Sequence, residues 1–284
     1  MSLSIEQSST LIIERAKQLV GQAIELRGNE TPPFRSEEYA SLKGVTKIIK
    51  ADLGEASGML LRLPDAHIIK LNASHYPTRQ NFSCAHEIGH ILLDELEREY
   101  TLGHEHYVGN PSYRIAGTPK RNRVIKKPIE RLCDIAATEL LMPENVFRKY
   151  LNSFGLSVSV IERLAKIFQV SIPSAAMRVA EVSTEPCIVI QWKKPRKSKS
   201  TGLDLVWRHS TLSKIGDRNN YMPVHTHISP PSTLLEAYNG DRIVESSKQF
   251  KVDKLVKRLP IQSKGFGYGN ERYVISLAFS DRQS

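Results

Sequence analysis

The sequence feature that most constrains the fold is the pentapeptide His86-Glu87-Ile88-Gly89-His90. Residues four apart lie one above the other on a helix face, so both imidazoles can reach one Zn²⁺ ion from the same side. Glu87, next to the first histidine, can then take a proton from a water that the metal polarises. The pattern therefore predicts a helix that carries metal ligands, and it indicates metal-assisted hydrolysis, most often of a peptide bond.

Apolar residues around the pentapeptide and a polar stretch after it predict a partly buried helix over about residues 79–97. Gly89 is an unusual residue in the middle of a helix, because glycine costs about 1 kcal/mol there relative to alanine. Close approach of a strand, a substrate or a second helix would explain the glycine. A chance match on a core helix is disfavoured, since two histidines and a carboxylate are costly to bury without a metal.

A third metal ligand is expected in the segment that begins with Pro128, a residue that suits the first turn of a helix. Glu130, Asp134, Ala137 and Leu141 follow helical spacing on one stripe that turns apolar, so the two acidic side chains should point inward. Glu130 can coordinate the metal, and Asp134 can hold a ligand histidine by its other ring nitrogen. The alternative is a solvated helix start whose acidic residues are favoured by the helix dipole.

Other residues stay open for the remaining roles. Rival third ligands lie in a polar stretch that looks like a loop: Glu99, His104, Glu105 and His106. Candidates for stabilising the oxyanion, by chain position only, are Tyr100, His104, His106 and Tyr107. A purely structural zinc site is disfavoured, because three ligands leave a position open and no fourth ligand is evident at close spacing.

Together these residues resemble the ImmA/IrrE family of bacterial metallopeptidases. The resemblance covers roughly residues 50–181 and rests on Ile68–Asn72, Arg79-x-x-Phe82 before the pentapeptide, the segment from Glu130 to Pro143, and Phe168–Arg178. It implies that His86, His90 and Glu130 are zinc ligands and that Glu87 is the catalytic base. It also implies a protein substrate, a helix-turn-helix repressor, whose inactivation switches on stress, mobile-element or defence genes.

Composition predicts a soluble, cytoplasmic protein. Hydrophobic residues make up 40% and charged residues 25% of the 284 residues, as in ordinary globular proteins. No apolar run is long enough to span a membrane, and the N-terminus lacks a secretory signal pattern. Cys84, Cys133 and Cys187 are few and scattered, which argues for reduced thiols. Lone and flanked by apolar residues, Cys84 and Cys133 are interpreted as part of the core rather than as ligands.

The predicted fold class is α+β, in three parts. Residues 1–156 should form a mainly helical, zincin-like peptidase domain with a small sheet, which includes a helix over 10–27 and a hairpin over 58–71. Residues 157–183 should form a helix-turn-helix-like segment, for which packing is favoured over DNA reading. Residues 184–284 should form a basic α+β sensor or docking domain, with strands at 187–192, 203–207 and 273–279 and short helices at 232–238 and 246–256.

Positive charge is concentrated in the last part of the chain. Residues 184–284 hold 17 Lys and Arg against 9 Asp and Glu, and so account for eight of the ten net positive charges. Two interpretations stay open: a surface for nucleic acid or another polyanion, and a solvated loop. The run concerned is Lys193, Lys194, Arg196, Lys197 and Lys199. His225 and His227 are an incomplete metal site and are interpreted as a partly exposed pair.

The sequence thus predicts a zinc metallopeptidase that acts on a protein partner and lies outside any membrane. The alternative is a non-proteolytic regulator, or a toxin or defence effector, that binds a repressor or nucleic acid. Glu87 favours the enzyme, because a purely structural site has no use for a carboxylate beside the metal ligand.

Overall fold

A computed structural model describes residues 4–100, 123–195, 201–211, 222–223, 226–252 and 255–279. The chain divides into two compact units. Unit 1 comprises residues 1–146 and 167–171, and unit 2 comprises residues 147–166 and 172–284. The described residues form helices, a three-stranded sheet and a seven-stranded sheet, which gives the predicted α+β fold.

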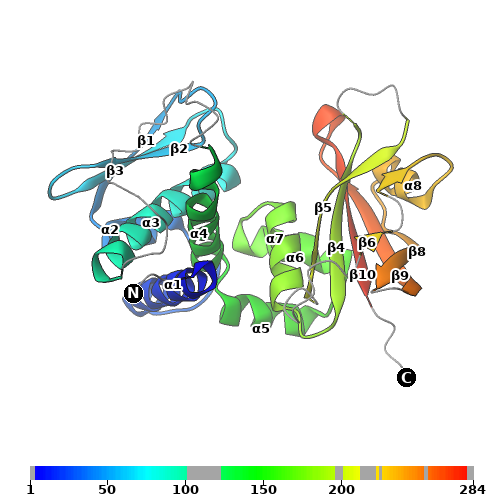
Figure 1. The fold of residues 1–284 in the computed structure, drawn as a ribbon, viewed down its shortest axis with the longest axis horizontal. Coiled ribbons are helices and arrows are strands. Elements are labelled where there is room, and N and C mark those ends of the chain that lie inside the picture. The colour runs from blue at the N-terminus through cyan, green and yellow to red at the C-terminus, as the bar shows by residue number, and fades with distance from the viewer. Residues whose placement is uncertain are drawn as a thin grey trace. The chain divides into compact units, whose positions relative to one another are not determined.

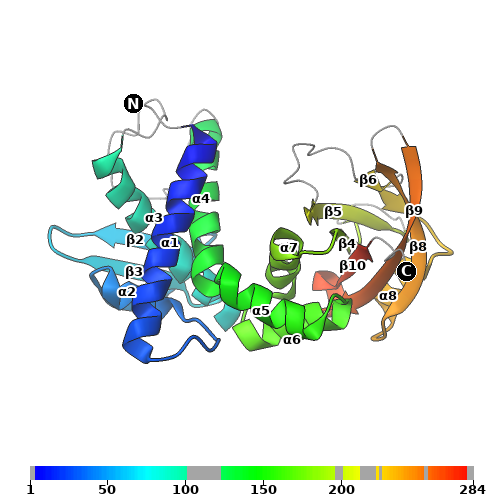
Figure 2. The same cartoon turned by 90° about the horizontal axis from the view of Figure 1, so that it is seen from below.

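Four helices build most of unit 1: α1 (Ile5–Arg27), α2 (Ser36–Leu42), α3 (Pro77–Glu99) and α4 (Arg123–Leu141). α3 and α4 pack along each other, and α1 packs against both (Figures 1 and 2). α1 starts earlier than the sequence suggested, because Ser4 and Gln7 form a capping box in which each side chain bonds the other's backbone N–H. Pro128 lies inside α4 and not at its first position.

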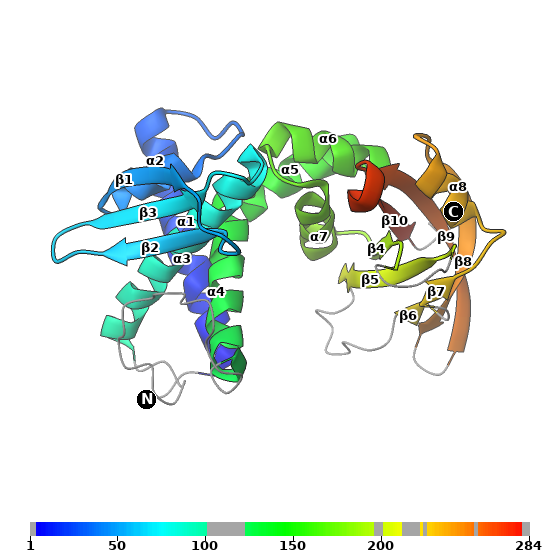
Figure 3. The same ribbon diagram turned by 90° about the horizontal axis from the view of Figure 1, so that it is seen from above.

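A three-stranded sheet completes unit 1. β1 (Val45–Ala51) pairs in parallel with β3 (His67–Asn72), and β2 (Gly58–Arg62) pairs antiparallel with β3, so the order is β1-β3-β2 (Figure 3). The predicted hairpin is therefore confirmed. β2 is an edge strand, and both β2 and β3 pack against α3. This places one edge of the sheet beside the helix that carries both histidines.

Three helices open unit 2: α5 (Glu144–Phe154), α6 (Val158–Phe168) and α7 (Ile172–Val182), although the ends of α5 and α6 fall in unit 1. α7 packs against strands of the large sheet. Arg178, the one basic residue of α7, is only 7% exposed and pairs with Glu181 at 3.2 Å. This burial favours packing, and not DNA reading, as the role of the α6–α7 pair.

The large sheet of unit 2 is antiparallel with the order β6-β8-β9-β10-β4-β5-β7. Its strands are β4 (Cys187–Lys193), β5 (Leu203–Ser210), β6 (Met222–Pro223), β7 (His227–Ile228), β8 (Val244–Val252), β9 (Leu255–Phe266) and β10 (Tyr273–Phe279). α8 (Thr233–Asn239) contributes Leu234, Ala237 and Tyr238 to a core that includes the fully buried Trp192.

The helix expected at 246–256 is wrong. Residues 244–252 form β8, paired along its whole length with β9. Phe250 of this strand is fully buried and belongs to the core that α8 covers, with Val244 packed beside it. Ser246 and Lys248 lie between them at a spacing of two, which is the periodicity of a strand. No helix in the described part of the chain is long and apolar enough to cross a bilayer.

Candidate metal centre

The two helices that carry the predicted ligands cross at Gly89. A Cβ atom placed on Gly89 would lie 3.0 Å from the Cα and 3.0 Å from the carbonyl oxygen of Cys133, and 3.3 Å from the Cβ of Ala136. These separations are closer than ordinary packing allows, so only glycine lets α4 approach α3 this closely. The close approach brings residues 130–134 of α4 beside His86 and His90 of α3. It explains the glycine that the sequence analysis singled out.

Carboxylates of α4 surround the two imidazoles. Glu130 places one oxygen 3.3 Å from Nε2 of His86 and the other 4.0 Å from Nε2 of His90. Asp134 lies on the far side of the first ring, with its Oδ1 2.8 Å from Nδ1 of His86. Two nitrogens and an oxygen bound to one zinc would lie roughly 3.3 Å apart, given zinc–ligand distances near 2.0–2.1 Å. The distances from Glu130 to the two imidazole nitrogens are therefore close to those that one shared zinc ion would impose.

The Nε2 atom of His86 is buried, and the Glu130 oxygen 3.3 Å from it does not meet the strict geometry of a hydrogen bond. Burial lowers the pKa of His86, but hydrogen bonding to Asp134 and Glu130 and the charge of Glu87 outweigh it and raise the pKa to about 9. The surroundings of this ring thus favour a positive charge. Asp134 holds the ring by Nδ1 and leaves Nε2 facing Glu130; once Nε2 loses its proton to a bound ion, this is the arrangement of a histidine metal ligand.

Glu87 is 7% exposed and lies against β2. A Cβ on Gly58 would sit 2.9 Å from Oε1 of Glu87, so the backbone of β2 covers this carboxylate without a side chain between them. Glu87 lines a cavity of about 320 Å³ together with His86, Glu130 and Asp134. The remaining walls are Ser57, Gly58, Arg79, Phe82 and Ser83. The cavity is lined by the predicted base, by two of the three predicted metal ligands and by the predicted positioning residue.

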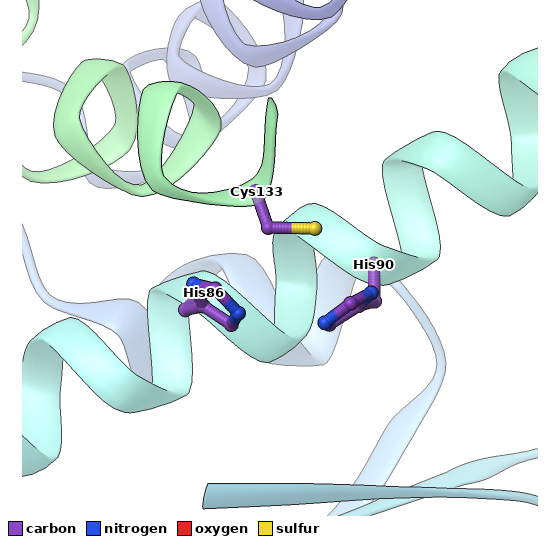
Figure 4. A group of neighbouring side chains, drawn as sticks. All are labelled: His86, His90 and Cys133. Atoms are coloured by element: carbon purple, nitrogen blue, oxygen red, sulfur yellow. The ribbon is translucent and has the colours of Figure 1, made fainter. Parts of the chain in front are cut away.

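Cys133 is the residue that the sequence analysis did not place at the site. Its sulfur and the ring nitrogens of His86 and His90 all lie within 4.8 Å of one another, and the thiol is fully buried (Figure 4). Burial raises the pKa of this thiol well above its ordinary value, with the neighbouring acidic groups acting in the same direction. Its spacing from Glu130, three residues along a helix, was the available signal.

The rival ligands and oxyanion candidates are placed as follows. Glu99, at the end of α3, forms an ion pair with Arg15 of α1. Tyr100 follows that helix and is 42% exposed. His104, Glu105, His106 and Tyr107 lie outside the described residues, as does His225. His227 pairs with Asp204, with 2.5 Å between Nδ1 and Oδ1.

The basic run of unit 2 is described only at its start. Lys193 pairs with Glu271 at 3.1 Å, and Nζ of Lys194 lies 4.8 Å from the centre of the Tyr238 ring. Arg196, Lys197 and Lys199 lie outside the described residues. Polyanion binding by this run stays a prediction.

Comparison with known proteins agrees with the site. The model of the IrrE N-terminal-like domain matches residues 45–180. The chain is 32% identical over 147 residues to a radiation response metalloprotease, IrrE, of Deinococcus radiodurans, and 33% identical over 128 residues to the protein of that name of Deinococcus deserti. These alignments cover 50% and 44% of this chain, and 40% of the length of each relative.

The fold also resembles a solved structure described as a Mycobacterium tuberculosis transcriptional regulator. The TM-score is 0.58 at 13% identity, over 97% of this chain and 80% of the other, so the likeness concerns the fold alone. The domain match, the two relatives and the donor set formed by α3 and α4 all support a metallopeptidase. Residues 45–180 thus match the IrrE N-terminal-like domain, and over this region the chain is similar to metallopeptidases of the ImmA/IrrE family.

Proposed function

We propose that the chain is a zinc-dependent metalloendopeptidase that cuts a protein partner, a helix-turn-helix transcriptional repressor, and so switches on a stress, mobile-element or defence response. The observation that carries the proposal is the set of donors at the α3–α4 crossing. The imidazole of His86 and the carboxylates of Glu130 and Glu87 line one cavity, and the ring of His90 lies 4.0 Å from Glu130 beside it. A structural site would need no such adjacent base.

His86, His90 and Glu130 would hold the ion. Bound there, zinc supplies a Lewis acid that polarises a water and the substrate carbonyl. Nitrogen and carboxylate donors in a three-residue set are typical of catalytic zinc sites, where a fourth position stays open. The buried Nε2 of His86 supports this assignment, because the Glu130 carboxylate lies 3.3 Å from it, where one bound ion would engage both atoms.

Glu87 would act as the general base. It follows the first ligand in the chain, lines the cavity and is covered by the backbone of β2. From this position it takes a proton from the attacking water and returns it to the leaving amine. Asp134 would be a positioning residue, because its bond to Nδ1 of His86 fixes which ring nitrogen faces the metal.

An extended polypeptide suits the space beside Glu87. The cavity is bordered by Ser57 and Gly58 at the start of β2, and β2 is an edge strand among the described parts of the sheet. A peptide that pairs with such an edge through its main chain would pass over the metal centre without a strict demand on side chains.

The free, buried state of Cys84, Cys133 and Cys187 supports a reducing, cytoplasmic location.

The assignment of a repressor as the substrate rests on the family resemblance, so the experiment should identify substrates without choosing one in advance. Cells that express the wild type are compared with cells that express Glu87→Gln, and new protein N-termini are mapped by mass spectrometry. We expect Glu87-dependent cleavage to be concentrated in a helix-turn-helix DNA-binding protein. Glu87-dependent cuts confined to unrelated proteins would refute the repressor but keep the peptidase. An identical set of N-termini in both strains would favour the non-proteolytic alternative.

A further inference from the structure

The fully buried thiol of Cys133 lies inside the donor set of the proposed metal centre, and that set does not need it for catalysis. Cys133 is three residues after Glu130 on α4, so both side chains project to the same face of the helix. Its sulfur is within 4.8 Å of ring nitrogens of both His86 and His90 (Figure 4). The sulfur of Cys133 and the carboxylate of Glu130 therefore both lie close to the same two imidazoles.

The helix crossing fixes the cysteine at that point. The closest backbone approach at Gly89 is to Cys133 itself, at its Cα and carbonyl oxygen. Gly89 lies between the two histidines in the chain, so the crossing places the cysteine next to both rings. A residue elsewhere on α4 would not have this central position.

The distances are close to those of a sulfur ligand. Zinc lies about 2.3 Å from a thiolate sulfur and 2.0–2.1 Å from an imidazole nitrogen, so the two donors of one tetrahedral ion would be roughly 3.6 Å apart. The present spread of up to 4.8 Å exceeds this by an amount that rotation of side chains can supply. Cys84 gives a contrast: it is equally buried on α3, two residues before His86, but does not belong to this group.

We propose that Cys133 is a fourth, displaceable metal ligand that closes the coordination shell of the resting protein together with His86, His90 and Glu130. The inference rests on the proposed metal centre. On binding, the thiol loses its proton to solvent and the sulfur takes the position that the reaction needs open. Four protein ligands make a closed zinc site, so the peptidase is latent until substrate displaces the sulfur. Cys133 is thus a regulatory ligand and not a catalytic residue.

Cobalt(II) substitution tests this directly, because sulfur ligation gives a near-ultraviolet charge-transfer band that nitrogen and oxygen ligands do not. We expect the band in the full-length wild type and in Cys84→Ala, the matched control. We expect its loss in Cys133→Ala and in Cys133→Ser, which stays closer in volume, while the visible bands of bound cobalt persist in every variant. Saturating acetohydroxamate should abolish the charge-transfer band of the wild type without releasing cobalt.

Three other results would contradict different parts of this proposal. Visible cobalt bands without a charge-transfer band in the wild type would overturn the cysteine ligand and leave the proposed metal centre intact. A charge-transfer band that survives saturating acetohydroxamate would show a permanent ligand, and so would overturn displacement. Absence of any cobalt spectrum would overturn the metal centre itself, and with it the proposed function.

Discussion

Replacing Gly89 by alanine should separate helix propensity from helix packing. In a helix open to solvent, alanine is about 1 kcal/mol more favourable than glycine. At position 89 the added methyl would meet backbone atoms of Cys133 at 3.0 Å, so α4 must move, and overpacking of this kind costs about 1–3 kcal/mol. Gly21 of α1 is the matched control, because a Cβ there meets nothing within 4 Å.

We therefore expect Gly21→Ala to raise the opening free energy of unit 1 by about 0.5–1 kcal/mol and Gly89→Ala to lie about 1–3 kcal/mol below it. Hydrogen exchange of amides in α3, measured by mass spectrometry on metal-free protein, reports unit 1 directly. Tryptophan fluorescence does not, since Trp192 and Trp207 both lie in unit 2. Gly89→Ala must also weaken zinc binding, because α4 carries Glu130. If both variants were equally stabilised, the close crossing would not be the reason for the glycine.

Three further changes probe single contacts. Gly58→Ala should displace the Glu87 carboxylate, because its Oε1 would lie 2.9 Å from the new methyl group. The kcat of peptide cleavage should fall while zinc content stays at the wild-type level. A kcat equal to wild type would show that the carboxylate adapts. Asp134→Asn should weaken zinc affinity about 10–100-fold in a chelator competition, and unchanged affinity would exclude its positioning role. Burial lowers the pKa of Lys248 to about 8, and its Nζ lies 4.9 Å from the centre of the Trp192 ring. The unfolded chain keeps this proton up to the ordinary lysine pKa of 10.5, so the free energy of unfolding of unit 2 should rise as pH increases from 8 to 10.5. Tryptophan fluorescence should titrate near pH 8 in wild type but not in Lys248→Met.

Helix α3 and its partner α4 could be predicted from the sequence because helical spacing places the candidate ligands on one face. His86, His90, Glu130 and Asp134 come together as that spacing predicted. Cys133 is buried in the core, as the sequence predicted, but its spacing from Glu130 shows only that the two share a helix face and not that the cysteine lies at the crossing with α3. Gly89 indicated that another segment packs closely against its helix, but only the structure shows that this segment is the backbone of Cys133.

Long-range pairing explains the other errors. Residues 246–256 alternate small, charged and apolar side chains in a way that fits either a short helix or a strand, and pairing with β9 decides between them. The start of α1 moved because a serine and a glutamine close a capping box that the apolar pattern alone does not reveal. Local propensity is overridden in the first case and supplemented in the second.

Peptide cleavage and zinc content, measured in the same samples of wild type and Glu87→Gln, test whether Glu87 is the base of a zinc peptidase. The substitution keeps the shape of the side chain but removes the base, which lines the cavity beside the ligands. We expect about one zinc per chain in both proteins, because the proposed site holds a single ion, and cleavage about 10²–10⁴-fold slower in the variant. Equal cleavage by both zinc-loaded proteins would contradict the assignment of Glu87 as the base and, with it, the account of how this site works.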